Sequence, residues 1–203
     1  MIIEQPAKYL RWIYPRAYWR MPDKEKVVYL TFDDGPIPEA TPFILDVLDR
    51  YHIKATFFMV GDNARRYPHL LHEVRARGHR LGNHTMHHLS GFKVGTRHYL
   101  NDVALANKLL RTKLMRPPHG WMRWDEYALL SRHYKVVMWD VITRDYSRRL
   151  SAADVVDNVK RYSRPGSIIT FHDSLRSIDK LRTALPESIE WLQSQGYRFA
   201  LIP

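Results

Sequence analysis

Val27-Val28-Tyr29-Leu30-Thr31-Phe32-Asp33-Asp34-Gly35-Pro36 is a β-branched and aromatic run that ends in two adjacent carboxylates and a Gly-Pro pair. Its first part has the composition of a buried strand, and Gly-Pro is a turn signal. The chain bends at the end of a strand, so both carboxylates can point into one cavity. Neighbouring carboxylates repel each other, burial increases that cost, and a bound cation would relieve it. An Asp-Gly turn that only caps the next helix is the alternative interpretation.

The composition limits the classes of protein to which this chain can belong. It has 203 residues, of which 45% are hydrophobic, so we expect one folded domain and exclude a disordered protein. It contains no cysteine, so a metal site must use histidine and carboxylate ligands. The formal net charge of +11 is compatible with a nucleic-acid partner, but the basic residues are scattered and no nucleic-acid-binding motif is present. We expect no nucleic-acid partner, and at most a weak peripheral contact with an anionic membrane or polymer.

The first 26 residues are expected to be a basic and aromatic extension that packs on the domain formed by residues 27–203. This extension includes the segment from Tyr9 to Arg20. No apolar run approaches the roughly 20 residues of a membrane span, and the N-terminus lacks the apolar core of a signal peptide. We therefore expect a cytoplasmic location, with peripheral binding at the inner membrane face as an alternative.

Strand-like segments alternate with helix-like segments about seven times along the chain. After the first strand, further strands are expected at residues 55–60, 79–83, 113–115, 135–139, 167–171 and 197–201. Such alternation predicts parallel strands joined by crossover helices. Seven units in 203 residues suit a small, incomplete β/α barrel, because a full barrel typically needs about 250 residues. An open doubly wound sheet is the alternative fold.

Acids, histidines and an arginine follow five of the expected strands. They are Asp33 and Asp34 after the first, His84 after the third, Arg116 after the fourth, Asp140 and Asp145 after the fifth, and His172 and Asp173 after the sixth. The carboxyl ends of the strands of a β/α barrel meet on one face, where catalytic groups gather. The sequence therefore predicts that all these residues share one cavity.

The segment His84-Thr85-Met86-His87-His88 predicts a metal site. If this turn is helical, His84 and His88 share a face at i and i+4, whereas His87 points away. With one carboxylate they would form a two-histidine, one-carboxylate set that leaves positions open for water. Zinc suits such a site, and Co²⁺, Ni²⁺, Mn²⁺ and Fe²⁺ would also fit.

Five segments together resemble the ordered motifs of the polysaccharide deacetylases, the NodB-homology group or carbohydrate esterase family four. They are Thr31-Phe32-Asp33-Asp34-Gly35-Pro36, His84-Thr85-Met86-His87-His88, Arg116-Pro117-Pro118, Asp145 and His172. The resemblance covers about Val27 to the last residue and implies a distorted β/α barrel. It also implies a metal-dependent hydrolase that removes N-acetyl groups from a GlcNAc-containing polysaccharide or oligosaccharide, similar to peptidoglycan or chitooligosaccharides.

The resemblance also implies roles for individual residues. Asp34, His84 and His88 would bind one divalent metal, most simply zinc. Asp33 would be the general base that deprotonates a water activated by the metal, and Arg116 would hold Asp33 charged and oriented. These roles agree with the chemistry, because hydrolysis of an amide requires a polarised carbonyl and a nucleophilic water.

The second half of the reaction involves residues from the later motifs. By the same resemblance, His172 would be the general acid that protonates the leaving amine, with Asp145 steering its imidazole. The backbone N–H of His119 would join the metal in stabilising the oxyanion. An acid and a base in separate environments would supply the two proton transfers that the reaction needs.

Four positions near the substrate pocket depart from the usual pattern of the family: His119, Ile142, Tyr146 and Thr170. We expect Pro118, His119, Tyr146 and Thr170 to contact the substrate. His119 and Tyr146 stand where aromatic residues, in the second case tryptophan, are usual, and Thr170 replaces a leucine of the acetyl pocket. Ile142 replaces the first aspartate of the fourth motif. The pocket should therefore be more polar than in typical members.

Other functional classes remain open on the sequence alone. A non-catalytic carbohydrate-binding protein would need neither Asp33 nor His172, so their presence favours an enzyme. An amide hydrolase that acts on a small non-sugar substrate would use the same residues. A protein that binds or cleaves nucleic acid would show strongly salt-dependent binding to DNA or RNA.

Overall fold

The computed structural model describes residues 4–6, 10–22 and 24–203. The strands are β1 (Val27–Asp33), β2 (Thr56–Met59), β3 (Arg80–Asn83), β4 (Leu114–Met115), β5 (Lys135–Val136), β6 (Val141–Ile142), β7 (Ile168–His172) and β8 (Arg198–Phe199). The α-helices are α1 (Leu10–Ile13), α2 (Thr41–Arg50), α3 (Gly61–Arg66), α4 (Pro68–Ala76), α5 (Thr96–Leu110), α6 (Trp124–Leu130), α7 (Ala152–Tyr162) and α8 (Ile178–Ser194). Short 3₁₀ helices cover Gly91–Lys93 (η1) and Pro118–Gly120 (η2).

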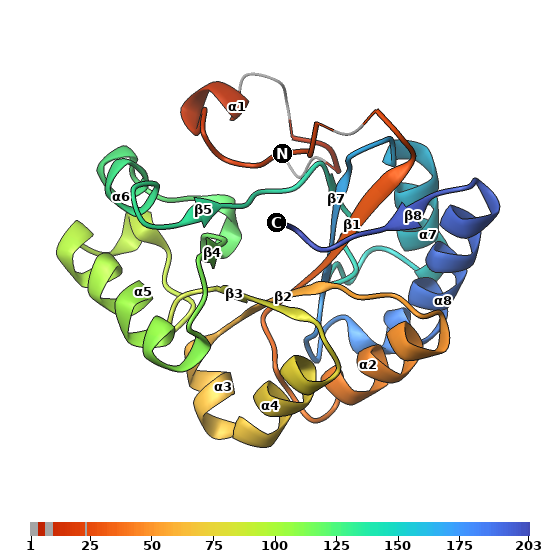
Figure 1. The fold of residues 1–203 in the computed structure, drawn as a ribbon, viewed down its shortest axis with the longest axis horizontal. Coiled ribbons are helices and arrows are strands. Elements are labelled where there is room, and N and C mark those ends of the chain that lie inside the picture. Colours follow the sequence, from red (N-terminus) through yellow and green to blue (C-terminus); the bar gives the residue numbers. More distant parts are fainter. Residues whose placement is uncertain (1–3, 7–9, 23) are drawn as a thin grey trace.

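The strands form a parallel sheet that curls into an incomplete barrel. Their order is β5-β4-β3-β2-β1-β7-β6, and β8 pairs with the beginning of β1. This order follows the chain around a circle in which β5 and β6 do not pair within the described residues, whereas the order of a doubly wound sheet reverses at a switch point. Figure 1 shows the curled sheet with α2, α4, α5, α7 and α8 around it. The prediction of a distorted, incomplete barrel is confirmed.

The seam between β5 and β6 is where the sequence predicted the strands least well. The strand expected at residues 135–139 is reduced to Lys135–Val136, and the two-residue strand Val141–Ile142 was not predicted. Beyond β5 the chain pairs instead with the N-terminal segment, because Tyr18 forms a parallel bridge with Val137 and Met138 N donates to Tyr18 O at 2.8 Å. Such pairing depends on a segment more than a hundred residues away, so no local pattern could indicate it.

The described part of the N-terminal segment lies along this seam. Tyr18 N donates to Val136 O at 2.8 Å on the β5 side, and Ile142 N donates to Glu4 O at 2.9 Å on the β6 side. Tyr9, which the sequence analysis included in the basic and aromatic segment, lies outside the described residues. The segment therefore supplies main-chain partners to the outer edges of β5 and β6, the two edge strands of the sheet.

Alternation along β1 decides which side chains reach the barrel interior. Val28, Leu30 and Phe32 belong to the main hydrophobic core, which includes buried residues of α2, α7 and α8. Successive strand residues point to opposite faces, so Thr31 and Asp33 point to the other side, into the barrel. Both are nevertheless buried, because the side chains of neighbouring strands fill the interior. The sequence of β1 thus places an aspartate at the mouth of the barrel.

The outer helices are amphipathic rather than uniformly apolar. The longest, α8, has 17 residues and buries one side that includes Leu181, Leu185 and Leu192. No helix in the described part of the chain is long and apolar enough to cross a membrane.

Candidate active site

A cleft of about 690 Å³ opens at the carboxyl ends of the strands. Asp33 and Asp34 enter it from the end of β1, His84 and His88 from the loop after β3, and His172 from the end of β7. Parallel strands present these ends to the same face of a barrel. The structure therefore brings together residues that are far apart in the sequence.

Three of these residues form a cluster that could hold a metal ion. His84 Nε2 lies 3.6 Å and His88 Nε2 3.2 Å from Asp34 Oδ1. One ligand atom from each residue lies within 4.8 Å of the others. Two ligands at zinc distances of roughly 2.0–2.1 Å, separated by a tetrahedral angle, would stand about 3.3 Å apart. The donor set and its spacing therefore suit a divalent cation with two nitrogen ligands and one oxygen ligand.

The loop that carries the two histidines is irregular, so the two rings meet without the helical turn that would have placed them on one face. Thr85 and His88 adopt left-handed φ angles of 63° and 54°, which a right-handed helix does not allow. Asp102 on α5 fixes the loop, because its Oδ2 accepts from Met86 N at 2.8 Å and from His87 N at 3.0 Å. Asp102 was not predicted as a site residue, since an acid within an amphipathic helix carries no local signal.

His87 lies outside the metal cluster, as the sequence analysis expected. Its Nδ1 is 2.5 Å from Asp102 Oδ1, and about half of its side chain is exposed. The fixed loop thus turns His84 and His88 toward Asp34 and His87 toward α5.

Burial and charge set the protonation states of the cluster. His84 is buried, its Nδ1 lies 2.8 Å from Arg116 O, and burial lowers its pKa to about 4. Burial acts to raise the pKa of Asp34, but the histidines around it, first among them His88 through a hydrogen bond, outweigh burial and lower that pKa. At neutral pH the cluster therefore presents a neutral His84 imidazole and a carboxylate, which are the forms that bind metals.

The Asp33 carboxylate is held by a fully buried arginine. Arg116 Nη1 donates to Asp33 Oδ1 at 2.7 Å and to Thr31 Oγ1 at 2.9 Å. The rest of the guanidinium donates to main-chain oxygens, Nε to Val137 at 3.2 Å and Nη2 to Met138 at 2.8 Å. A buried charge of this kind is stable only when it is paired and hydrogen-bonded, and here it has both. The pair fixes one orientation of the Asp33 carboxylate at the cleft wall.

His172 belongs to a second ion pair on the other side of the cleft. Its Nδ1 lies 2.8 Å from Asp145 Oδ1, and its main-chain N donates to Asp145 Oδ2 at 2.7 Å. Burial acts to lower the pKa of His172, but the carboxylates of Asp145, Asp34 and Asp33 outweigh it and raise the pKa to about 9. The imidazole is therefore protonated at neutral pH. Tyr146 packs edge-on against it, with ring centroids 4.8 Å apart.

Asp173, which follows His172, supports the turn after β1. Its Oδ1 accepts from Gly35 N at 2.9 Å and its Oδ2 from Thr41 Oγ1 at 2.9 Å. Burial raises the pKa of Asp173 to about 8 although these hydrogen bonds oppose the shift. A Cβ on Gly35 would overlap the Asp173 carboxylate, so only glycine allows this close approach.

Not all the predicted residues line the cleft: Arg116 and Asp145 are buried and contact the lining residues Asp33 and His172, whereas Asp140 has no such contact, and for it the prediction is wrong. Asp140 is fully buried and forms ion pairs with Arg11 at 2.9 Å and with Arg164 at 2.6 Å. Ser167 Oγ donates to its Oδ2 at 2.8 Å. These partners come from the N-terminal segment and from the turn before β7, so the carboxylate points to the seam of the barrel and away from the cleft.

The four expected substrate contacts divide into two groups. His119 and Tyr146 line the cleft, and the centroids of the His119 and His88 rings are 4.7 Å apart. Pro118 is buried and does not line the cleft, contrary to expectation. Thr170 does not line it either, because it precedes His172 by two strand residues and lies about 7 Å deeper in the barrel. Its Oγ1 is 3.1 Å from Thr31 Oγ1, in the layer beneath Asp33.

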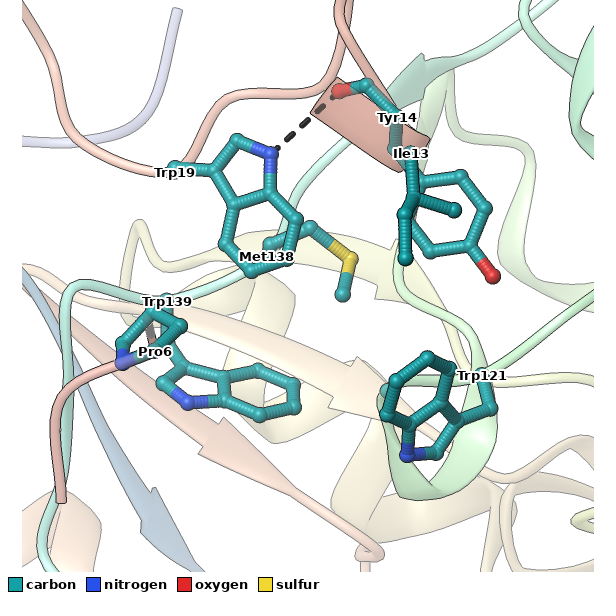
Figure 2. A pocket seen from close by; sticks show the side chains of 8 residues that line it. Pro6, Ile13, Tyr14, Trp19, Trp121, Met138 and Trp139 are labelled. Carbon is teal, nitrogen blue, oxygen red and sulfur yellow. Dashed lines mark hydrogen bonds between the residues drawn. The ribbon is translucent and has the colours of Figure 1, made fainter. Parts of the chain in front are cut away.

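A small aromatic cavity of about 40 Å³ adjoins the cleft. Figure 2 shows the side chains of Trp19, Met138, Trp139 and Trp121 around it, with Trp19 Nε1 donating to Tyr14 O at 3.3 Å. The two cavities share lining residues, among them Pro6, Trp121 and Trp139. The volume suits a few water molecules or a methyl-sized group rather than a sugar ring. The N-terminal segment thus forms part of the wall near the candidate site.

Comparisons with known proteins identify similar chains. A sequence profile described as polysaccharide deacetylase matches residues 20–133. A peptidoglycan-N-acetylglucosamine deacetylase of Bacillus cereus is 33% identical over 198 residues, which cover 93% of this chain and 92% of that protein. A chitooligosaccharide deacetylase of Sinorhizobium fredii is 40% identical over 156 residues, or 72% of this chain and 71% of that protein.

The fold is also similar to that of a solved structure. The crystal structure of a peptidoglycan N-acetylglucosamine deacetylase, bound to an N-oxidanyl-benzamide, superposes with a TM-score of 0.89 and 33% sequence identity. The match covers 95% of this chain and 94% of that one. The likeness therefore extends over nearly the whole chain and not only over the motifs.

Proposed function

This chain belongs to the polysaccharide deacetylase family, carbohydrate esterase family four, and we propose that it removes N-acetyl groups from a GlcNAc-containing glycan. The substrate class is peptidoglycan or chitooligosaccharide, as the names of the similar proteins indicate. One observation carries the proposal: two pairs suited to proton transfer, Asp33 with Arg116 and His172 with Asp145, flank the candidate metal cluster. A protein that only binds carbohydrate would need neither pair.

Asp34, His84 and His88 are the proposed ligands of one divalent cation, with Zn²⁺ the best match to the donor set and Co²⁺, Ni²⁺, Mn²⁺ and Fe²⁺ as alternatives. A cation bound there supplies Lewis acidity for the amide carbonyl and for the attacking water. Three protein ligands leave coordination positions open. The Arg116 main-chain oxygen, 2.8 Å from His84 Nδ1, orients the ring so that Nε2 points to the cluster.

Asp33 is the proposed general base. Its carboxylate lines the cleft beside Asp34 while its Oδ1 accepts from Arg116. This ion pair occupies Oδ1 and leaves the second carboxylate oxygen able to accept a proton from water. Arg116 is a positioning residue in this proposal, because it acts on the reaction through Asp33.

His172 is the proposed general acid for the leaving amine. The Asp145 carboxylate at Nδ1 raises its pKa, and the imidazolium can donate its Nε2 proton into the cleft. The amide nitrogen must gain this proton before the C–N bond breaks, because an amide anion is a very poor leaving group. Asp145 orients the ring and keeps it charged.

Substrate contacts are proposed at the rim of the cleft. His119 and Tyr146 line it, next to His88 and His172 respectively. No described residue accepts a hydrogen bond from the main-chain N–H of His119, which is therefore available to a developing oxyanion. We also propose that residues 27–203 form the catalytic domain and that the extension before them completes the seam beside the aromatic cavity.

Acetate release tests the proposal directly. N-acetylated chitooligosaccharides and peptidoglycan fragments would be incubated with zinc-loaded protein, chelator-treated protein and the zinc-loaded Asp33→Asn variant. We expect release only by the zinc-loaded native chain, because each control removes one part of the machinery. No release by a native chain with one bound metal would reject these substrates, and failure to bind a metal would reject the site.

A further inference from the structure

A third cavity, of about 510 Å³, lies at the opposite end of the sheet from the candidate active site. Arg80, the first residue of β3, and Lys135, the first residue of β5, both line it. The active-site residues, by contrast, lie at the last residues of strands or just after them. The two cavities share no lining residue among the described ones, so they are separate sites.

The charged side chains that line this third cavity are all positive. No aspartate or glutamate among the described residues lines it, and none of its five basic side chains forms an ion pair with an aspartate or a glutamate of the described residues. Nearby acids are already engaged, since Asp49 and Glu73 pair with Arg77. The basic residues that line the cavity are Arg75, Arg80, Arg111, Lys113 and Lys135.

Some of these side chains are held in place by main-chain oxygens. Arg75 Nη2 donates to Leu110 O at 3.1 Å, and Lys135 Nζ donates to Pro203 O at 3.2 Å. The Leu110 carbonyl oxygen is neutral, so it fixes the position of the Arg75 side chain without cancelling its charge. The cavity is therefore a concave, partly organised group of donors rather than a set of freely moving surface side chains.

A buried histidine adds a donor without a partner. His79 lines the cavity, is only 5% exposed, and its Nδ1 accepts from Ala55 N at 3.1 Å. Because Nδ1 accepts, the proton of the neutral ring must reside on Nε2. This buried N–H has no hydrogen-bond partner among the described residues, and such a group is costly unless a ligand or water satisfies it.

We propose that this cavity binds a phosphate-bearing anion, either free or as the headgroup of a phospholipid. Phosphate oxygens accept several charge-assisted hydrogen bonds at once, which matches a cavity lined by three arginines and two lysines. The side chains of Arg111 and Lys113 form no hydrogen bond or ion pair with another described residue, so they are available to the anion. An anion seated beside His79 would accept from its Nε2.

The test compares two double variants with the same change of charge. Arg111→Gln with Lys113→Gln neutralises the cavity, whereas Arg50→Gln with Lys160→Gln neutralises two exposed cations on α2 and α7. Binding of the metal-loaded full chain to inorganic phosphate is measured by calorimetry at constant ionic strength. Sedimentation with phosphatidylglycerol vesicles, and with phosphatidylcholine vesicles as a control, tests the lipid source.

We expect the cavity variant to weaken binding at least about tenfold, since it removes two charge-assisted donors. The control variant should change binding less than about twofold, and both should retain deacetylase activity on uncharged chitooligosaccharides. Phosphate should also shift the ¹⁵N signal of His79 Nε2. If the cavity variant loses binding to inorganic phosphate alone, the ligand is a free anion. If it also loses binding to phosphatidylglycerol vesicles, the ligand is a phospholipid headgroup. No binding, an unshifted His79 signal, or equal loss in both variants would overturn the proposal.

Discussion

His84 is buried and the His172 side chain is only 12% exposed, both at the carboxyl ends of strands, yet their pKa values move in opposite directions. His84 is bonded to the neutral main-chain oxygen of Arg116, and burial lowers its pKa to about 4. His172 is bonded to the Asp145 carboxylate, which with Asp34 and Asp33 raises its pKa to about 9 against the effect of burial. The partner at Nδ1 thus decides whether a buried histidine is a neutral ligand or a charged acid.

We expect the largest effect when the neutral histidine, His84, is removed. His84→Ala should lower the affinity for metal at least about 100-fold and reduce deacetylation to background at limiting zinc, because the chain loses a ligand. Metal content by atomic absorption, together with acetate release, checks this. His87→Ala is the matched control, since His87 lies in the same loop but bonds Asp102. An equal loss in both variants would mean that the loop, not the ligand, is responsible.

Removal of the base should be the next largest effect. Asp33→Asn should lower kcat by about 10²–10⁴ while leaving the affinity for metal nearly unchanged, because Asp33 pairs with Arg116 and not with the two histidines. Steady-state kinetics and a zinc titration separate the two quantities. If the variant lost metal and activity in parallel, Asp33 would belong with the ligands.

The ion pair of His172 with Asp145 gives a prediction about how the rate depends on pH. His172 must be protonated to donate, so kcat/KM should fall as pH rises through its pKa of about 9. Asp145→Asn removes the largest opposing charge, so the fall should move to lower pH and the rate at pH 8 should drop about tenfold or more. A pH profile of the two proteins checks this. An unchanged alkaline limb would exclude His172 as the acid.

The raised pKa of His172 should also make the free energy of unfolding depend on pH. The unfolded histidine titrates near 6.5, so the ion pair stabilises the fold fully below that pH and loses its contribution as pH rises toward 9. The native chain should therefore lose more stability between pH 6.5 and 9 than Asp145→Asn does. Chemical denaturation at both pH values measures the difference. Parallel losses would show that other groups dominate the titration.

The smallest effect is expected at the loop that orients the neutral ligands. Asp102→Ala leaves the amides of Met86 and His87 without their acceptor, so the loop loosens and the affinity for metal should fall about tenfold. Asp102→Asn keeps an oxygen acceptor and should lose less. Zinc titrations of the two variants rank them, and an equal loss in both would show that charge rather than hydrogen bonding matters.

Much of this arrangement could be predicted because it depends on local pattern. The run ending in Asp33 and Asp34 predicted both the strand and the carboxylates at its end, and about seven alternations of strand and helix predicted the incomplete barrel. Residues that follow separate strands met on one face because parallel strands leave little choice. The positions of His84, His172 and Arg116 therefore followed from strand order.

The remainder depends on contacts between distant segments. Asp140 looks like a cleft residue from its position after a strand, but Arg11 and Arg164 turn it toward the seam. Thr170 faces the barrel interior like His172, but it lies one layer of side chains below the cleft. Asp102 accepts hydrogen bonds from the irregular loop that carries His84 and His88, and its place within a helix gave no sign of this role. Each depends on tertiary partners that no local periodicity encodes.

A titration of the imidazole nitrogens of His84 and His172 by ¹⁵N NMR, in the metal-free protein, tests the central claim most directly. We expect His172 to stay protonated until the pH approaches 9, and His84 to stay neutral until the pH falls toward 4. If both rings titrated together near 6.5, the two partners would not distinguish a ligand from an acid, and the assigned roles would be contradicted.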